Sequence, residues 1–478
     1  MILHQFEAKG LSHFSYAVGD KVAGEIAIVD PERDIQTYLS YAAENRLKIK
    51  YILETHIHAD FASGAKELGQ KTGAELLLSG YDTNEKFEYQ FPHTPVKDGD
   101  IFNIGHAKIQ VLHTPGHTPE HISFLVFDTE NNADEPMAIL SGDFLFIGSL
   151  GRPDLLGEAD KLPLARKQYH SVVDKLAGLP DRLEVYPAHG AGSLCGAGMS
   201  KAKSSTLGDE RASNPYLQDM SEDAFVAKIL GTVPPFPDYY LRMKRINSEG
   251  PEILDGLPEL LGINPEEFEK LVLKNATIVD VRHPLTFGGG HIPGSLNIGM
   301  GDQLGFWGAW FMPYEKPVYL VIDDESKLKG YVRDLVRVGL DNIAGYLAPN
   351  FSAWVSKGYD FQDLPQASVH TVKDLKEFGE KMTIIDVRSD SEFDEGHIKG
   401  AKHIYLGNIE QRLKELPNKE EMICCICGGG SRSSLAASVL EKNGYENVYN
   451  VFGGMTAWKA AGYAIQSTVI SEQSTVTK

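Results

Sequence analysis

Short apolar runs alternate with polar loops over about the first 190 residues of the chain. The runs are rich in β-branched and aromatic residues, which is typical of strands. Amphipathic stretches between them predict helices at about 34–46 and 160–178. Because strands and helices alternate, we expect a layered α/β domain. The predicted strands are 22–29, 49–53, 108–112, 122–127, 137–140 and 183–186.

The second half of the chain contains an internal repeat. The run TIVDVR at 277–282 returns as TIIDVR at 383–388, and the pattern G-H-I-x-G at 290–294 returns at 396–400. Both matches have the same offset of 106 residues, which predicts two tandem copies of one α/β unit. A break near residue 250 and a polar linker at 358–366 separate the copies from their neighbours. The predicted domains are 1–250, 251–360 and 366–468.

Length, charge and cysteine usage narrow the function classes. At 478 residues the chain is long enough for about three domains. Its net charge of −20 argues against nucleic-acid or anionic membrane partners, and no apolar stretch approaches the roughly 20 residues of a membrane helix. We expect no signal peptide. Of the four cysteines three lie in 424–427, which indicates thiol chemistry in a reducing cytoplasm rather than a disulfide scaffold.

Side chains able to bind a metal follow four of the predicted strands. Because such strand ends meet at one edge of a sheet, we expect these side chains to converge on a metal site. A single histidine after a strand is usually a turn or core residue, but four groups in phase with four strands favour the metal. The residues are His56, His58 and Asp60 after the second strand, His113 and His117 after the third, Asp143 after the fifth, and His189 after the sixth.

The run from His56 to Asp60 resembles the opening motif of the metallo-β-lactamase fold, H-x-H-x-D-H. The last position of that motif is Phe61 in this chain. In dinuclear zinc hydrolases of the fold this histidine helps to bind the second metal, so the resemblance implies a mononuclear site here. The implied fold of the first domain is an αββα sandwich.

Further motifs narrow the resemblance to the persulfide dioxygenase branch of that fold. They are THIHAD at 55–60, PGHTP at 115–119, SGD at 141–143, GRPD at 151–154, YPAH at 186–189 and NP at 214–215. The resemblance implies one Fe(II) per chain, held by His56, His117 and Asp143. Two imidazoles and one carboxylate on one face are the ligand set of non-haem Fe(II) oxygenases. His58, Asp60 and His189 are then expected to orient ligands or substrate.

Two further residues near the predicted metal site are candidates for substrate binding. An arginine is most often part of a surface salt bridge, but Arg152 matches an arginine of the branch, which favours binding of an anionic substrate or organisation of the site. Cys195 lies in a glycine-flanked loop six residues after His189, where simpler persulfide dioxygenases have a tyrosine-bearing loop. It could accept sulfur, form a mixed disulfide with substrate, or be a passive loop cysteine.

A second chemical motif lies in the last predicted domain. The apolar run 422–426 predicts a buried strand, followed by a glycine-rich turn into a helix. Backbone N–H groups of that turn, the helix N-terminus and an arginine all favour a thiolate or persulfide at Cys427. The pattern resembles the rhodanese signature, whereas cysteine-based phosphatases need the arginine one position later. The predicted site is Cys427 with Gly428, Gly429, Gly430, Ser431 and Arg432; Cys424 and Cys425 are expected to be core thiols.

The first repeat copy carries no thiol at the matching place. After its strand at 318–322 the sequence continues with Asp323, which we take as the counterpart of Cys427. A carboxylate cannot carry sulfane sulfur, so this copy is predicted to be a non-catalytic rhodanese-like domain. Its aromatic run 306–311 is explained equally well by docking against a neighbouring domain or by core packing.

Taken over residues 1–468, the chain resembles bacterial fusions of a persulfide dioxygenase, a silent rhodanese and an active rhodanese. The implied activity is oxidation of low-molecular-weight thiol persulfides with O₂ to sulfite and thiol, with sulfur transfer through Cys427 to sulfite giving thiosulfate, or the reverse. Such chemistry serves sulfide detoxification. The alternatives are a zinc thioester hydrolase of the glyoxalase II type and a non-catalytic persulfide sensor or sulfur carrier. A homo-oligomer is compatible with the fold.

Overall fold

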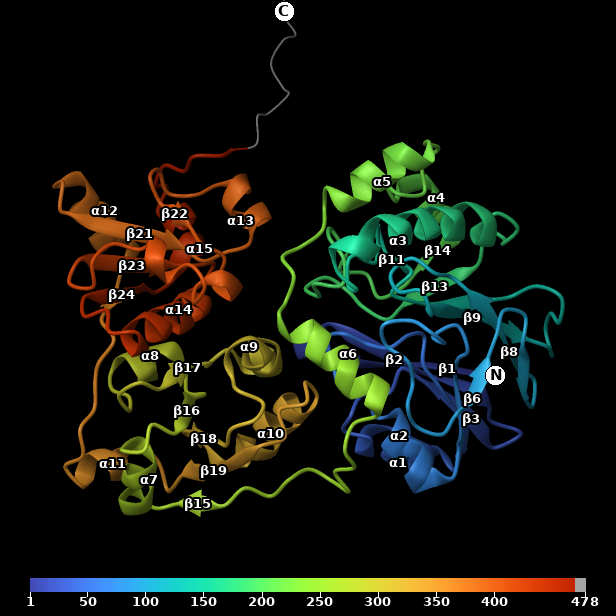
Figure 1. The fold of residues 1–478 in the computed structure, drawn as a ribbon, viewed down its shortest axis with the longest axis horizontal. Coiled ribbons are helices and arrows are strands. Elements are labelled where there is room, and N and C mark those ends of the chain that lie inside the picture. The colour runs from blue at the N-terminus through green and yellow to red at the C-terminus, as the bar shows by residue number, and fades with distance from the viewer. Residues whose placement is uncertain (469–478) are drawn as a thin grey trace, which may run out of the picture. The chain divides into compact units, whose positions relative to one another are not determined.

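The computed structural model describes residues 1–468, and these divide into two compact units (Figure 1). The first comprises Met1–Pro258 together with Val332–Leu340. The second comprises Glu259–Tyr331 and the chain from Asp341 onward, so it holds most of both repeat copies. The end of the first unit lies close to the boundary predicted at residue 250, while the predicted boundary between the two copies stays a prediction.

The first unit is a sandwich of two six-stranded sheets. Apolar side chains of both sheets, such as Val18, Leu53, Val111 and Phe124, form the core between them. Helices cover the outer face of each sheet, with α1 and α2 on the first and α3, α4 and α5 on the second. These layers confirm the predicted αββα sandwich. In sheet order the strands are β1 (Ile2–Ala8), β2 (His13–Asp20), β3 (Glu25–Val29), β4 (Lys48–Leu53), β5 (Glu75–Ser79) and β6 (Thr94–Val96), then β14 (Ser205–Thr206), β13 (Glu184–Pro187), β10 (Ala138–Gly142), β9 (Ile122–Asp128), β8 (Ala107–His113) and β7 (Ile101–Ile104).

All six predicted strands of this unit are present, as β3, β4, β8, β9, β10 and β13. The predicted helices are present as α1 and as α3 continued by a π-helical turn. A short hairpin follows β10. The helices are α1 (Gln36–Asn45), α2 (Ala65–Thr72), α3 (Glu158–His170), the π-helical turn (Ser171–Lys175), α4 (Leu207–Ser213), α5 (Glu222–Leu230) and α6 (Tyr239–Glu249), and the hairpin is formed by β11 (Leu145–Phe146) and β12 (Ser149–Leu150).

The second unit contains two parallel five-stranded sheets with the same strand order, which is the structural form of the sequence repeat. The first is β15 (Gly262–Ile263), β19 (Ile343–Leu347), β18 (Val318–Val321), β16 (Thr277–Asp280) and β17 (Leu296–Asn297); the second is β20 (Gln366–Ala367), β24 (Val448–Val451), β23 (Met422–Ile426), β21 (Met382–Asp386) and β22 (Lys402–His403). The helices of the first copy are α7 (Pro265–Val272), α8 (Pro284–Gly288), α9 (Leu304–Phe311), α10 (Leu328–Val336) and α11 (Phe351–Ser356); those of the second are α12 (Val369–Glu377), α13 (Asp390–Glu395), α14 (Ser431–Lys442) and α15 (Gly454–Ala460).

Local sequence signals explain where several of these helices begin. Asn264 caps α7 through its side-chain oxygen, and proline occupies the first position of that helix. Ser389 and Glu392 form a reciprocal capping box at the start of α13. That cap fixes Glu392, which contacts the sulfur site described below.

The aromatic run 306–311 forms α9 and packs against the second copy. Trp307 is buried, and its ring centroid lies 6.3 Å from that of Tyr405. The Trp310 ring lies directly over Gly407, where a Cβ would come within 2.6 Å of it. The structure thus decides the question that the sequence left open: this run docks on the neighbouring copy as well as filling its own core.

A half-buried carboxyl group between the two copies predicts a pH-dependent stability. Burial raises the pKa of Glu441 to about 8, and its Oε2 lies 3.6 Å from His291 Nε2. Between the ordinary glutamate pKa and pH 8 the folded chain retains a proton that the unfolded chain has released. The free energy of unfolding of this unit should therefore fall as the pH rises through that range.

Glu441→Gln removes this titration, so we expect the variant to gain stability over the native chain at pH 8 and not at pH 5. Urea titrations followed by tryptophan fluorescence measure this unit selectively, because all four tryptophans, 307, 310, 354 and 458, lie in it. The exposed Glu446→Gln is the matched control. Parallel pH profiles of the native chain and Glu441→Gln would contradict the assignment.

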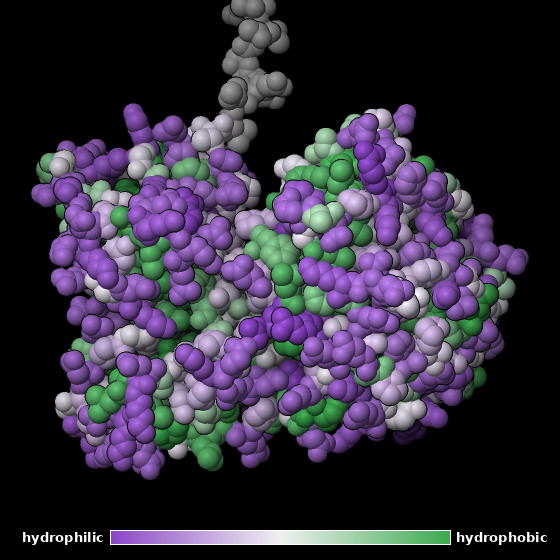
Figure 2. Space-filling view, viewed as in Figure 1, coloured by the Kyte–Doolittle hydropathy of each residue, from purple (hydrophilic) through white to green (hydrophobic). Residues whose placement is uncertain are grey.

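The surface agrees with the acidic, charged composition. Figure 2 shows a face that is mostly hydrophilic, with apolar residues in scattered groups. Within residues 1–468, no helix combines the length and the apolar character needed to cross a membrane.

Candidate metal centre and sulfur site

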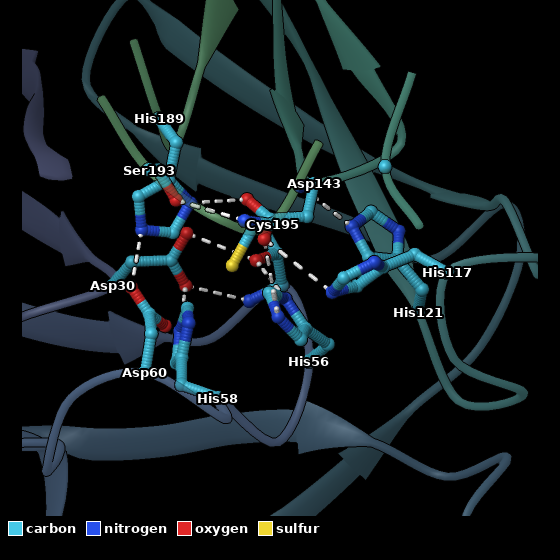
Figure 3. A network of polar contacts seen from close by, with 12 residues as sticks. Asp30, His56, His58, Asp60, His117, His121, Asp143, His189, Ser193 and Cys195 are labelled. Carbon is cyan, nitrogen blue, oxygen red and sulfur yellow. Dashed lines mark hydrogen bonds and ion pairs between the residues drawn. The ribbon is translucent and has the colours of Figure 1, made fainter. Parts of the chain in front are cut away.

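The structure brings the predicted ligand groups together at one edge of the sandwich (Figure 3). The loops after β4, β8 and β10 carry His56, His117 and Asp143, and the loop after β13 carries His189. All four side chains are buried. Loops that leave neighbouring strands at the same sheet edge thus converge as expected, on a rigid scaffold.

His56, His117 and Asp143 aim three donor atoms at one point. His117 Nε2 lies 3.4 Å and His56 Nε2 3.9 Å from Asp143 Oδ2, and the three atoms fall within 4.8 Å of one another. Within the described part of the chain, none of these buried atoms has a hydrogen-bond partner. Buried polar atoms normally have partners, so this unsatisfied trio fits a metal ion. Two imidazoles and one carboxylate are donors that a divalent transition metal accepts.

The other ring nitrogens of both histidines are held by the protein. His117 Nδ1 donates to the backbone carbonyl of Arg152 at 2.9 Å. His56 Nδ1 lies 3.0 Å from Thr55 Oγ1, which in turn donates to Asp30. A hydrogen bond from Nδ1–H places the Nε2 lone pair toward the metal position.

The electrostatics keep the three groups in their ligand forms. Burial lowers the pKa of His117 to about 4 and holds that of His56 well below its usual range, so both rings are neutral. Burial opposes ionisation of Asp143, but His189, whose Nδ1 lies 2.6 Å from Asp143 Oδ1, holds the pKa of this carboxyl well below its usual range. Neutral imidazoles and an ionised carboxylate are what a cation requires.

His189 and its neighbours form a charged layer behind the ligands. Burial lowers the pKa of His189, but Asp143 and Asp60 raise it well above the ordinary value, and its Nε2 lies 2.7 Å from Asp60. His58 Nε2 lies 3.1 Å from Asp30. The predicted orienting residues therefore contact ligands or one another, although their effect on activity stays a prediction.

Phe61 closes the place where dinuclear relatives of this fold have a further histidine. Its ring is fully buried and lies 4.4 Å from the His58 ring and 4.1 Å from the His13 ring. An aromatic ring supplies no metal ligand there. The number of metals at His56, His117 and Asp143 stays a prediction.

Sequence reasoning missed several residues that support this centre. His121 accepts a hydrogen bond from the Asp143 backbone N–H at 3.0 Å, and its position two residues after PGHTP at 115–119 could have indicated it. Lys244 and Asn247 come from α6, far along the chain, and donate to backbone carbonyls of the 56–61 loop. No local pattern identifies these two, because only the fold brings α6 to that loop.

Arg152 is an organising residue in this structure. Its guanidinium is buried, and its five N–H groups have acceptors in Asp154 and in the carbonyls of Leu194, Pro234 and Pro235. A guanidinium has five donors, so none remains for an anion. Next to it, a Cβ on Gly151 would lie 1.9 Å from the Asp143 carbonyl oxygen. The geometry favours the second of the two predicted roles, organisation of the site, over direct binding of substrate.

Cys195 lies beside the metal centre but is deeply buried. Its Sγ is 3.8 Å from Tyr240 Oη, and it forms a second close cluster with Asp60 and His189. Burial and then the nearby carboxylates of Asp60 and Asp143 raise the pKa of this thiol well above its usual range. A protonated thiol is a poor nucleophile, which favours the passive reading of the three that the sequence left open.

The sulfur site is built at the end of β23. Cys427 is buried, with Sγ 3.1 Å from the Gly430 backbone nitrogen and 3.3 Å from Ser433 Oγ, both of which donate to it. Arg432 forms a bidentate pair with Glu392 at 2.6 and 2.7 Å. Burial opposes ionisation of Glu392, but Arg432 lowers its pKa to about 2. N–H groups, a helix N-terminus and a cation therefore surround the sulfur.

The strand before Cys427 carries two further cysteines. Cys424 and Cys425 are buried on β23, and burial raises the pKa of Cys424 to about 12, as suits core thiols.

The predicted counterpart of Cys427 in the first copy, Asp323, was wrong by one residue. β16 pairs Asp280 with Val321 and β21 pairs Asp386 with Ile426, so the match is Ile322 and not Asp323. Isoleucine cannot carry sulfane sulfur either, so a non-catalytic first copy stays the prediction.

Comparisons with known proteins agree with this geometry. The metallo-beta-lactamase superfamily model matches residues 10–189. A metallo-beta-lactamase from Staphylococcus aureus of known crystal structure is 34% identical, covers 72% of this chain and 98% of its own, and superposes with a TM-score of 0.66. The chain belongs to the metallo-β-lactamase superfamily. It also carries two rhodanese-like domains, matched at 264–357 and 368–461, inside the two ranges predicted for the copies.

Two further proteins match the chain at lower sequence identity. An uncharacterized protein of Mycobacterium leprae is 30% identical over 241 residues, which are 46% of this chain and 100% of that protein. A beta-lactamase hydrolase-like protein of Agrobacterium fabrum is 29% identical over 291 residues, and the match spans only 63% of that protein. Both domain types of this chain come from enzyme families.

Proposed function

We propose that this metallo-β-lactamase superfamily member oxidises low-molecular-weight thiol persulfides with O₂ and transfers sulfur through Cys427. The observation that carries the proposal is the mononuclear ligand face of His56, His117 and Asp143, joined in one chain to a rhodanese sulfur loop. Phe61 in place of a metal-binding histidine argues against the dinuclear zinc hydrolase alternative. The chain would serve sulfide detoxification.

The oxidation step is balanced as RSSH + O₂ + H₂O → RSH + SO₃²⁻ + 2 H⁺. The outer sulfur loses four electrons, and O₂ gains them. Fe(II), when bound, supplies the activation of O₂ that no side chain can provide. His56, His117 and Asp143 would hold it, while His189 keeps Asp143 ionised.

The transfer step uses the residues around Cys427. A second persulfide gives its outer sulfur to the cysteine, RSSH + Cys427–SH → RSH + Cys427–SSH. Sulfite then takes it, Cys427–SSH + SO₃²⁻ → Cys427–SH + S₂O₃²⁻. The Gly430 N–H and Ser433 hydroxyl stabilise the sulfur anion in both steps. Placing both sites in one chain raises the effective concentration of sulfite near Cys427.

Oxygen uptake with a purified thiol persulfide separates this proposal from its alternatives. We expect about one iron per chain and O₂ consumption that depends on glutathione persulfide or a similar thiol persulfide. A zinc pair with hydrolysis of an acyl thioester and no O₂ uptake would identify a hydrolase instead. Persulfide binding without turnover would identify a sensor or carrier.

Arg152 offers a test of how the metal site is organised. In Arg152→Lys the ammonium group has too few donors for the five acceptors that Arg152 contacts. We therefore expect kcat for O₂ uptake to fall about tenfold, with an unchanged KM for persulfide. Steady-state kinetics at saturating O₂ measure both constants. Arg166→Lys, an arginine of α3 with exposed partners, is the matched control. A raised KM with unchanged kcat would instead make Arg152 a substrate-binding residue.

A further inference from the structure

The silent rhodanese copy contacts the helix that forms the sulfur site. Helix α14 begins at Ser431, directly after the sulfur loop. At the end of β17 in the silent copy, Asn297 Oδ1 accepts a hydrogen bond from Ser434 Oγ at 2.6 Å. The Asn297 backbone N–H donates to Ser438 Oγ at 3.0 Å. All three residues are buried, so these bonds do not compete with water.

Asn297 is itself held rigidly by its own copy. Its Nδ2 donates to the backbone carbonyls of Asp280 and Arg282 at 3.1 and 3.0 Å. These two bonds fix which end of the amide faces α14, because only Oδ1 can accept from Ser434. Through these hydrogen bonds the Asn297 side chain links the backbone of the silent copy to α14 of the second copy.

The hydrogen bond from Ser434 to Asn297 lies one residue along α14 from the residue that contacts the sulfur. Ser433, next to Ser434, has its Oγ 3.3 Å from Cys427 Sγ and 2.6 Å from Asn450 Oδ1. With its single proton the Ser433 hydroxyl can serve only one of these acceptors at a time. A small shift of α14 would change whether that proton faces the sulfur, and would also move Gly430 N–H.

The residue that matches Asn297 in the second copy is a histidine, His403. By sheet register, Asn297 pairs with Asp280 as His403 pairs with Asp386. His403 Nε2 lies 2.8 Å from the Arg388 carbonyl, the equivalent of the Asn297 bond to Arg282. Asparagine keeps this internal bond and adds an acceptor for Ser434.

A second contact joins the silent copy to the copy that carries Cys427. Trp310 of the silent copy lies over Gly407 and 6.0 Å, between ring centroids, from Tyr405. Leu406–Asn408, which follow Tyr405 in the chain, contact α14. The silent copy thus supports the second copy at two places next to α14.

We propose that Asn297 of the silent copy is a positioning residue for sulfur transfer at Cys427. It holds α14 so that Gly430 N–H and the Ser433 hydroxyl face the Cys427 sulfur. The inference rests on the proposed sulfurtransferase function of Cys427. The silent copy, which has no catalytic cysteine of its own, would thus hold the Cys427 site in its active geometry.

The test measures Cys427 in two ways in the full-length chain. For Asn297→Ala we expect kcat for transfer from thiosulfate to cyanide to fall about fivefold with an unchanged KM. The rate at which iodoacetamide alkylates Cys427, followed by peptide mass spectrometry, should fall by a similar factor. Ser434→Ala removes the other partner and should match it, and the double variant should be no slower than either single variant.

Asn264→Ala is the matched control, because it removes a helix cap from the same copy without contact to α14. We expect both rates to stay native in this variant. Equal slowing by Asn264→Ala would mean general destabilisation and overturn the proposal, as would native rates in Ser434→Ala. If the native chain transferred no sulfur, the proposed function would fail, while the alkylation rates would still decide the role of Asn297.

Discussion

Replacing His117 with alanine should reduce persulfide-dependent O₂ uptake by about a thousandfold, which corresponds to about 4 kcal/mol of barrier. His117 is one of three groups whose unpartnered donor atoms converge, and its Nδ1 is fixed by the Arg152 carbonyl. Alanine leaves one imidazole and one carboxylate, too few protein ligands to hold iron in a three-ligand face. Metal analysis of the purified variant should show the same loss.

The control for this variant is His106→Ala, which removes a half-exposed histidine of the same unit. It should keep iron and O₂ uptake. Sulfur transfer by Cys427 should be native in both variants, because it needs no metal. Retention of full O₂ uptake in His117→Ala would remove this face from the oxidation step.

Cys427→Ser should abolish thiosulfate formation, with a loss of at least about a thousandfold, while sulfite production continues. Serine keeps the size of the side chain, and the loop donors remain, but an alkoxide does not form at neutral pH and cannot carry sulfane sulfur. Sulfite should accumulate instead of thiosulfate, and ion chromatography separates the two anions.

Cys424→Ala provides the matched thiol control, because Cys424 lies on the same strand and burial raises its pKa to about 12. We expect native product ratios from it. Undiminished thiosulfate from Cys427→Ser would mean that another group, such as Cys195, carries the sulfur.

Much of the metal centre could be predicted from sequence, because each ligand follows a strand and parallel or neighbouring strands end at a common edge. His56, His117 and Asp143 needed only that rule and the resemblance. The strands β1 and β2 were not predicted. In β2 every residue is buried, polar ones included; Ser15, for example, shares a hydrogen bond with Tyr38 of α1 at 2.8 Å. Where polar and apolar side chains are both buried, the strand shows no alternation of polar and apolar residues by which it could be predicted.

Other features depend on contacts that no local pattern encodes. Ile322 is apolar and buried like a strand residue, yet it leaves the ladder one position earlier than its run indicates, which misplaced the counterpart of Cys427. The sequence left open whether Arg152 binds substrate or organises the site, because its five bonds come from loops more than forty residues away as well as from Asp154. The Asn297 contact joins residues 137 positions apart.

The ratio of O₂ to thiol persulfide consumed tests the central claim most directly. With excess persulfide, the native chain should consume one O₂ for every two persulfides and form one thiosulfate, because half of the sulfane sulfur passes through Cys427 to sulfite. Cys427→Ser should consume one O₂ for each persulfide and form one sulfite. The same ratio in both proteins, or persulfide loss without O₂ uptake, would contradict the account.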